Sequence, residues 1–207
     1  MNNMFNQHWK RYDEWYERNR YTYLSELKLI KKMLPQKGKG LEIGVGTGRF
    51  AGPLGIMHGI EPSVNMAKLA RDRGIDVTVG VGESLPFCGG SFDYAAIIIA
   101  LCFVDNPEQV LQEARRVLKK DGILLIGFID KDSFLGKQYQ TKNSIFYRGA
   151  HLFSVNEVAL LIKKAKFNRL VYWQTLFTLP EEICEVQKPI KGFGKGGFVL
   201  VRCKCKK

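Results

Sequence analysis

The chain has 207 residues, and 32 lysines and arginines against 20 acidic residues give it a net charge of +12 at pH 7. This length can bury a hydrophobic core, and 45% hydrophobic with 25% charged residues excludes disordered, collagen-like and disulfide-scaffold proteins. No apolar run reaches the ~18 residues that a membrane-spanning helix needs. The sequence begins with polar residues and shows no signal-peptide pattern, and its number of cysteines, five, is odd. These features predict a cytoplasmic protein with reduced thiols.

The first 36 residues predict a helix with an aromatic face. Phe5, Trp9, Tyr12 and Tyr16 follow one another at spacings of four, three and four, and an apolar stripe continues to residue 34. Pro35 then ends the predicted helix.

Strands and helices alternate from about residue 41 to residue 129. Strands are predicted at 41–45, 56–60, 75–81, 92–101 and 123–129, with helices at 62–73 and 108–118 and a brief helix near 50. Ser63 is a candidate N-cap for the helix that follows it. Such alternation favours right-handed crossovers, and therefore a doubly wound α/β sheet.

The last third of the sequence has a different pattern. Residues 131–151 show no periodicity, and a segment of this kind is typical of a lid or a substrate loop. Ser154 begins a helix that runs to residue 165. Two β-rich runs, 169–177 and 198–205, then predict an antiparallel hairpin at the edge of the sheet.

A glycine-rich turn after the first predicted strand is the first sign of a ligand site. Gly44 and Gly46 allow a sharp bend and a close approach of the backbone to a ligand, and the next helix N-terminus presents its amides to an anionic group. A dinucleotide-binding fingerprint needs a third glycine at position 49, which is Arg49 here. The Walker A pattern is also absent. The motif that the sequence does contain is an acidic residue, Glu42, followed by x-Gly-x-Gly-x-Gly.

Three further motifs follow in order. Glu61 lies at the end of the second predicted strand, where a carboxylate can accept hydrogen bonds from a ribose diol. Residues 81–87 read Val-Gly-Glu-Ser-Leu-Pro-Phe and precede Ser-Phe-Asp at 91–93. The fourth motif comprises Ala-Leu-Cys-Phe-Val-Asp at 100–105 and Arg-Arg-Val-Leu-Lys-Lys-Asp-Gly at 115–122.

These four motifs together resemble the class I S-adenosylmethionine (SAM)-dependent methyltransferases, in particular the ubiquinone/menaquinone-biosynthesis type (methyltransferase type 11-like). The resemblance covers 41–129 and, more weakly, 153–170. It implies a Rossmann-like, mostly parallel seven-stranded sheet with an antiparallel edge hairpin and an N-terminal lid helix. The stretch from Gly48 to Glu61 is about four residues shorter than is usual in the family, so the first crossover helix must be short.

The resemblance also implies how the cofactor is held. Glu42 would orient the glycine loop near the methionine ammonium, Glu61 would hold the ribose, and the Ala100 backbone would accept from the methionine amine. The cofactor-binding residues implied in this way are Glu42, Gly44, Gly46, Gly48, Glu61, Pro62, Gly82, Glu83, Ser84, Leu85 and Ala100. Tyr12, Tyr16 and Phe103 are candidates for the substrate lid, and the product cofactor would be S-adenosylhomocysteine (SAH).

Methyl transfer needs orientation more than a catalytic constellation, and no metal site is predicted. His151 is the candidate general base, because it lies where the substrate loop ends. Cys102 is expected to be a buried thiol, and Cys203 and Cys205 lack the partners of a zinc site.

The distribution of net charge along the sequence indicates which kind of binding partner the protein has. Residues 1–50 carry +5 and residues 151–207 carry +7, whereas residues 51–100 carry −2. A mildly acidic cofactor half suits a cation better than a polyanion, so a small-molecule substrate with a nitrogen or oxygen nucleophile is predicted, without nucleic acid or membrane as partner. The alternatives are an RNA methyltransferase that uses the basic termini, a non-catalytic SAM-binding protein, and a nicotinamide dehydrogenase, which Arg49 disfavours.

We therefore expect one methyltransferase domain over residues 1–207. It would comprise a helical lid at 1–36, a cofactor-binding core at 37–130, a substrate loop at 131–153, and a helix with the edge hairpin at 154–207.

Overall fold

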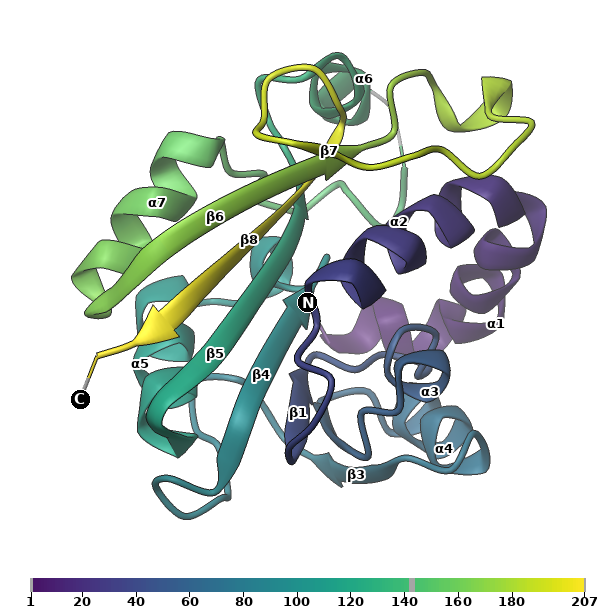
Figure 1. The fold of residues 1–207 in the computed structure, drawn as a ribbon. Coiled ribbons are helices and arrows are strands. Elements are labelled where there is room, and N and C mark those ends of the chain that lie inside the picture. Colours follow the sequence, from purple (N-terminus) through teal and green to yellow (C-terminus); the bar gives the residue numbers. More distant parts are fainter. Residues whose placement is uncertain (1, 142–143, 207) are drawn as a thin grey trace.

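A single sheet organises the computed structural model, which describes residues 2–141 and 144–206. Its strands run in the order β3-β2-β1-β4-β5-β8-β6-β7 (Figure 1). The strands are β1 (Gly40–Ile43), β2 (His58–Glu61), β3 (Asp76–Val79), β4 (Phe92–Ile98), β5 (Leu118–Ile129), β6 (Phe167–Thr175), β7 (Ile190–Lys191) and β8 (Phe198–Cys205). Strands β1 to β5 are parallel and the other three pair antiparallel, which confirms the doubly wound α/β prediction.

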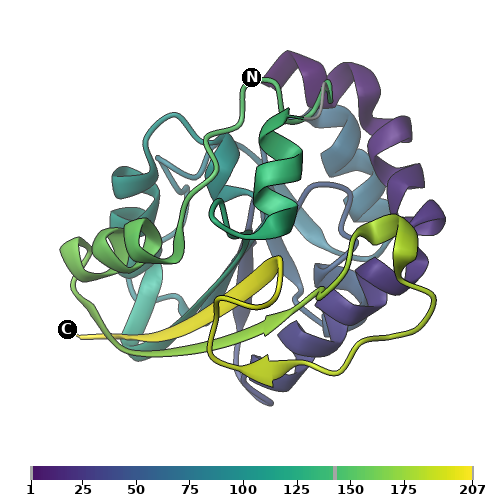
Figure 2. The ribbon, with the colours of Figure 1, turned by 90° about the horizontal axis from the view of Figure 1, so that it is seen from above.

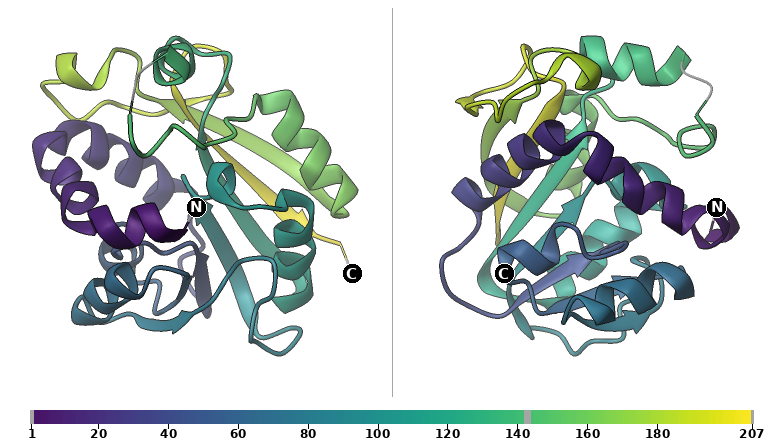
Figure 3. Two further views of the ribbon diagram at one scale, coloured as in Figure 1. Left: turned by 180° about the vertical axis from the view of Figure 1, so that it is seen from behind. Right: turned by 90° about the vertical axis from the view of Figure 1, so that its right-hand side faces the viewer.

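Helices cover both faces of the sheet (Figures 2 and 3). They are α1 (Asn2–Arg18), α2 (Arg20–Met33), α3 (Ala51–Leu54), α4 (Val64–Asp72), α5 (Pro107–Val117), α6 (Phe134–Thr141) and α7 (Val155–Lys164), with 3₁₀ turns at Leu101–Phe103 and Pro180–Glu182. Helices α5 and α7 pack on one face, and α1 to α4 contribute to the core of the other. No helix within the described ranges has the length and apolarity needed to cross a bilayer.

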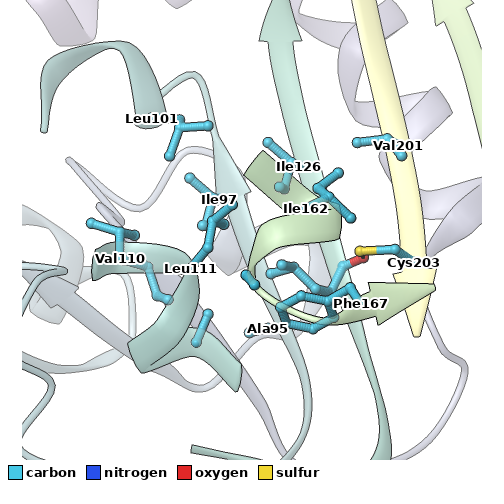
Figure 4. Packing of buried hydrophobic residues seen from close by; sticks show 14 of the residues in the cluster. Ala95, Ile97, Leu101, Val110, Leu111, Ile126, Ile162, Phe167, Val201 and Cys203 are labelled. Carbon is cyan, nitrogen blue, oxygen red and sulfur yellow. Dashed lines mark hydrogen bonds between the residues drawn. The ribbon is translucent and has the colours of Figure 1, made fainter. Parts of the chain in front are cut away.

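Side chains of the central strands alternate between the two cores. In β4, Ala95 and Ile97 face α5 and α7, whereas Ala96 and Ile98 belong to the opposite core. Figure 4 shows the first of these cores, which contains Cys203 together with aliphatic side chains and the ring of Phe167. Cys102 is buried as well, and burial raises the pKa of its thiol to about 12. This two-sided burial explains why the predicted strands are nearly continuous apolar runs.

Several helices begin where the sequence predicts. The Ser63 side chain accepts a hydrogen bond from the backbone of Met66 and caps α4, and Ser154 forms a capping box with Glu157 at the start of α7. Helix α3 has four residues, which confirms the short first crossover helix.

Three local expectations are wrong. The N-terminal helix is two helices, because Asn19 leaves helical geometry (φ −111°, ψ 46°). The sheet has eight strands instead of seven, and the hairpin is interrupted, because β8 inserts between β5 and β6 while the short β7 forms the edge. Strand β5 also begins earlier than the predicted 123–129, and residues 121–122 form a bulge inside it, where the register with β4 shifts.

The segment at 131–153 also differs from the expected irregular loop. It contains α6, and the Ser133 hydroxyl accepts a hydrogen bond from the backbone of Gly136 at the start of this helix. Residues 142 and 143 of the segment, like Met1 and Lys207 of the basic termini, lie outside the described residues.

An ion-pair clamp ties α1 to the glycine loop. The Asp13 carboxylate accepts hydrogen bonds from Arg49, Arg73 and the Thr47 hydroxyl. Burial raises the pKa of Asp13, but the hydrogen bonds from Arg73, Arg49 and Thr47 outweigh it and hold the pKa well below its usual range. Helix α1 is thus held to the glycine loop by these hydrogen bonds and ion pairs. Arg49, the residue that departs from the dinucleotide fingerprint, takes part in them.

We expect Asp13→Asn to lower the free energy of unfolding by about 2–3 kcal/mol, because it removes the carboxylate partner of the Arg73 guanidinium and leaves Arg49 with the exposed Glu17 in its place. Since the folded pKa of Asp13 is depressed, this stabilisation is present above the ordinary carboxyl pKa and is lost as the pH falls through the folded value. Urea unfolding between pH 3 and pH 7 measures it. Glu17→Gln, which removes only an exposed partner of Arg49, should change stability by less than ~1 kcal/mol. Equal losses in the two variants would contradict the clamp.

Candidate active site

A cavity of about 340 Å³ opens at the carboxyl ends of the parallel strands. Its walls come from the segments that follow β1, β2, β3 and β4, at the point where the strand order reverses between β1 and β4. In doubly wound sheets, ligands bind in the crevice at this switch point.

The glycine loop and Glu61 form one wall of the cavity. Gly44 and Gly46 have φ of +75° and +56°, in the left-handed region that favours glycine. One oxygen of the buried Glu61 carboxylate accepts from the Gly46 amide at 2.9 Å, and the other accepts from the Ser63 amide at 2.9 Å. Burial raises the pKa of Glu61, and these two hydrogen bonds oppose the shift. Glu61 therefore couples the loop after β1 to the start of α4.

Glu83 forms a second wall and joins two of the sequence motifs. Its Oε1 accepts from the backbone amides of Asp105, at 2.9 Å, and Asn106, at 3.2 Å. The motif after β3 is thereby held against the one after β4. Gly82 must be small here, because a Cβ would come within 2.9 Å of the Ile43 side chain.

Four aromatic rings form a roof, of which three line the cavity and the fourth, Phe146, packs against two of them. This roof comprises Phe5 and Tyr12 from α1, Phe103 after β4, and Phe146 after α6, with Phe5 at ring-centroid distances of 5.8 Å from Tyr12, 4.9 Å from Phe103 and 5.7 Å from Phe146. Tyr12 also contacts Phe146 at 5.8 Å. The N-terminal helix and the segment at 131–153 therefore meet above the strand ends, although they lie far apart in the sequence.

The charged residues in the cavity wall are all acidic. They are Glu61, Glu83 and Asp105, and no lysine, arginine or histidine of the described residues lines the cavity. Such a lining attracts a cation and repels a pyrophosphate. The described residues also contain no group of three His, Cys, Asp or Glu side chains that could hold a metal ion.

Comparisons with known proteins agree with this geometry. The profile of the family described as "Methyltransferase domain" matches residues 41–126. A crystal structure of a SAM-dependent methyltransferase from Thermotoga maritima, described as a possible histamine N-methyltransferase, is 45% identical, covers all of both chains and superposes with a TM-score of 0.97. The chain belongs to the SAM-dependent methyltransferases.

Other relatives are consistent with that family. An uncharacterized protein of Methanocaldococcus jannaschii is 43% identical over 96% of this chain and 97% of its own length. The demethylmenaquinone methyltransferase of Listeria welshimeri is 34% identical over an alignment of 110 positions that covers 46% of this chain and 47% of that protein. The similarity to this menaquinone-biosynthesis enzyme therefore extends over less than half of the chain.

The predicted site residues of this methyltransferase divide into two groups. The first group lines the cavity and comprises Gly44, Gly46, Glu61, Pro62, Gly82, Glu83, Ala100, Tyr12 and Phe103. The second does not line it and comprises Glu42, Gly48, Ser84, Leu85, Tyr16 and His151. Their roles toward a ligand stay predictions in both groups.

Members of the second group have other contacts. Glu42 is buried on β1, where burial raises its pKa well above the usual range, and its Oε2 has no hydrogen-bond partner among the described residues. Gly48 packs closely against α4 and the residues after it, since a Cβ there would lie 3.2 Å from the Ala70 backbone and 2.6 Å from the Ile75 side chain. Tyr16 is buried and shares a 2.8 Å hydrogen bond with Tyr12. His151 is exposed, and its ring packs edge-on against Phe153.

Sequence reasoning missed several residues of the cavity wall. Phe5 belongs to the predicted aromatic face, and its helical spacing to Tyr12 could have indicated it. Asp105 lies within a quoted motif, but its backbone contact with Glu83 leaves no sequence signal. Met66 lines the cavity from α4, where it looks like an ordinary core residue.

Two glycine-to-alanine variants, at Gly46 and Gly55, test whether the loop after β1 contacts the cofactor. We expect Gly46→Ala to weaken SAH binding at least tenfold, because its Cβ would project toward Tyr12 and Met66 at the cavity wall without a close clash. The left-handed backbone adds a stability cost of about 1–2 kcal/mol. Gly55→Ala carries the same backbone cost at φ +70° with nothing within 4 Å, and should keep its SAH affinity. Calorimetry and thermal melts measure both quantities, and equal SAH affinities would refute a ligand role for Gly46.

Proposed function

We propose that this methyltransferase transfers a methyl group from SAM to a nitrogen or oxygen nucleophile of a small molecule. The observation that carries the proposal is the acidic cavity at the strand ends beneath a roof of aromatic rings. When bound, SAM supplies a methyl group already activated on a sulfonium.

The residues present fit this cofactor. Beside Gly46 the nearest side-chain atoms to a built Cβ are 3.5–3.7 Å away, which leaves a cradle for a ligand against the backbone. Glu61 and Glu83 are the carboxylates that would face the ribose and the adenine end, and the acidic lining as a whole suits two positive charges. The roof rings present π faces that attract a cation and exclude water.

The roof also supports a small acceptor. Rings from α1, from the segment after β4 and from the segment after α6 contact one another above the cavity, which restricts access to compact molecules. The relative from Thermotoga maritima is described as a possible histamine N-methyltransferase, and this description supports a nitrogen nucleophile over an oxygen nucleophile. For a nucleic-acid acceptor, the basic C-terminal residues offer less support, because Lys204 is already paired with Asp121.

Two experiments test the function. The first is calorimetry with SAH. The second incubates the protein with SAM and a panel of amines, phenols and carboxylates, and detects the SAH that is formed. We expect micromolar SAH binding and turnover with at least one compound. Failure to bind SAH would overturn the proposal, and binding without turnover on a broad panel would favour a non-catalytic SAM-binding protein.

A further inference from the structure

One residue after β4 lies between the cofactor cavity and a second, much smaller pocket. Ile99 lines the cavity, and of the residues that the structure describes it alone also lines this second pocket. The pocket has a volume of about 10 Å³. Its other described walls carry no charged side chain and come from the 3₁₀ turn after β4, the end of β5, Tyr147 and residues 152–153. The Ile99 side chain therefore separates the cavity from an uncharged space behind it.

The backbone of Ile99 has an unusual conformation. Its φ is +51°, in the left-handed region, and among the described residues with such a φ it is the only one with a branched Cβ. A branched Cβ makes this region costly, and residues of this kind persist where their surroundings fix them, often at ligand sites. The Ile99 amide donates a hydrogen bond to the Gly127 carbonyl of β5 at 2.7 Å. Strand β5 thus holds Ile99 in place.

The turn at Ile99 places the residues after it against the glycine loop and the roof. A Cβ built on Gly44 would lie 2.6 Å from the Ala100 side chain, so Ala100 packs directly on the loop. The 3₁₀ turn that follows brings the Phe103 ring to 4.9 Å from that of Phe5. In the proposed complex Ala100 faces the methionine end of SAM. Its neighbour Ile99 then borders the space into which the methyl group is transferred.

The walls of this space suit a flat apolar molecule. Phe5 and Phe103 contribute rings from the roof, and Ile99 contributes an aliphatic side chain. Aromatic rings pack favourably on such partners, in stacked or edge-on arrangements. The acidic residues of the cavity belong to other segments of its wall, so the body of the acceptor meets no charge here.

We propose that Ile99 determines specificity and limits the acceptor to a single-ring aromatic amine or phenol. The ring lies between Ile99 and the roof rings of Phe5 and Phe103, and a second, fused ring would collide with the Ile99 side chain. The inference rests on the proposed function and narrows its acceptor class. Because the small pocket lies behind Ile99, shortening this side chain joins the pocket to the cavity and makes room for the second ring.

Calorimetry on the SAH-saturated protein tests the inference with two pairs of probes. The pairs are 2-phenylethylamine with 2-(2-naphthyl)ethylamine, and phenol with 2-naphthol, so the members of a pair differ only in their ring system. We expect the one-ring member of at least one pair to bind tenfold or more tightly than the two-ring member. The larger ring buries more apolar surface, so such a preference requires a wall that excludes it.

Equal affinities within both pairs would overturn the inference, and so would a failure of every probe to bind to a protein that holds SAH. A wild type that binds no SAH would instead refute the proposed function.

A variant assigns the limit to the side chain. Ile99→Ala should reduce the one-ring preference at least tenfold, through tighter binding of the two-ring probe. Val104→Ala is the matched control, because Val104 also lines the cavity but does not line the second pocket. It is judged by the ratio of the two affinities, which should stay within twofold of the wild-type ratio. An unchanged preference in Ile99→Ala, or an equal shift in Val104→Ala, would overturn the inference.

Ile99→Gly is the second variant, for use if Ile99→Ala does not hold SAH. It opens the same wall, and glycine adopts a φ of +51° without the cost of a Cβ. We expect the same loss of preference, and an unchanged preference would again overturn the inference. If neither variant held SAH, the wild-type preference would decide alone.

Discussion

Glu61→Gln is expected to weaken SAH binding by about 100-fold, equivalent to about 3 kcal/mol. Both oxygens of this carboxylate accept backbone hydrogen bonds, from Gly46 and from Ser63. An amide keeps the shape of the side chain, but its NH₂ group must then face one of two N–H donors. The loop after β1 and the start of α4 lose their common acceptor, and the proposed ribose contact is lost with it. Removing a hydrogen bond to a charged group costs about 1.5–3 kcal/mol.

The effect of Glu61→Gln is measured by titration calorimetry with SAH, with circular dichroism to show that the fold is retained. Asp76→Asn is the matched control, because it makes the same chemical change on neighbouring β3, where the carboxylate is exposed and paired only with His58 among the described residues. That variant should bind SAH as the wild type does. Wild-type affinity in Glu61→Gln would mean that the cofactor does not lie against this carboxylate.

Glu26→Gln is expected to make the protein more stable at neutral and alkaline pH. The folded pKa of about 8 lies above the ordinary carboxyl value of 4.5. An acid with a raised folded pKa is harder to ionise in the folded protein than in the unfolded chain. It therefore destabilises the fold increasingly as the pH rises from the unfolded pKa to the folded pKa. At pH 7 the cost is on the order of 3 kcal/mol, and it stops growing above the folded pKa. The amide cannot ionise, so the variant escapes this cost.

Thermal and urea unfolding from pH 5 to pH 9 measure that difference. The wild type should lose stability relative to the variant between about pH 5 and pH 8, and Glu14→Gln, which removes an exposed carboxylate from α1, should follow the wild type throughout. Parallel pH profiles for wild type and Glu26→Gln would show that Glu26 does not have a raised pKa.

Local patterns predicted the cofactor half well. The apolar strands, the short crossover helix and the Ser63 cap follow from periodicity, chain length and capping chemistry, which are properties of neighbouring residues. Glu61 was predictable because the end of β2 always delivers its side chain to the same edge of a parallel sheet. Gly44 and Gly46 were predictable because the turn after β1 needs left-handed backbone at these positions, and such a turn depends on neighbouring residues in the sequence.

The substrate half was less predictable, because its contacts join distant segments. The stack of Phe5 on Phe146 depends on how α1 and the segment after α6 pack. Helix α6 has weak periodicity of its own and begins at a hydroxyl cap. Glu26 looks like an exposed charge in a helix of mixed polarity, and only the packing of α2 against β6 and β8 shows that it is buried. His151 illustrates the converse, since its position in the sequence suggested a place in the site, whereas its exposed side chain does not line the cavity.

The insertion of β8 between β5 and β6 sets an order of events during folding. Strand β5 pairs with β8 over seven residues, from Ile123 to Ile129, and β6 pairs in the described sheet with β8 and the short β7 alone. While a ribosome is still making the chain, β6 therefore has nothing to join, and the apolar edge of β5 stays open until residues 198–205 emerge. Because these pairings are distant in sequence, closure of the sheet is expected to be a late step. A nascent chain stalled at residue 190 should accordingly bind chaperones or aggregate through β5, although every residue of the cofactor cavity has by then been synthesised.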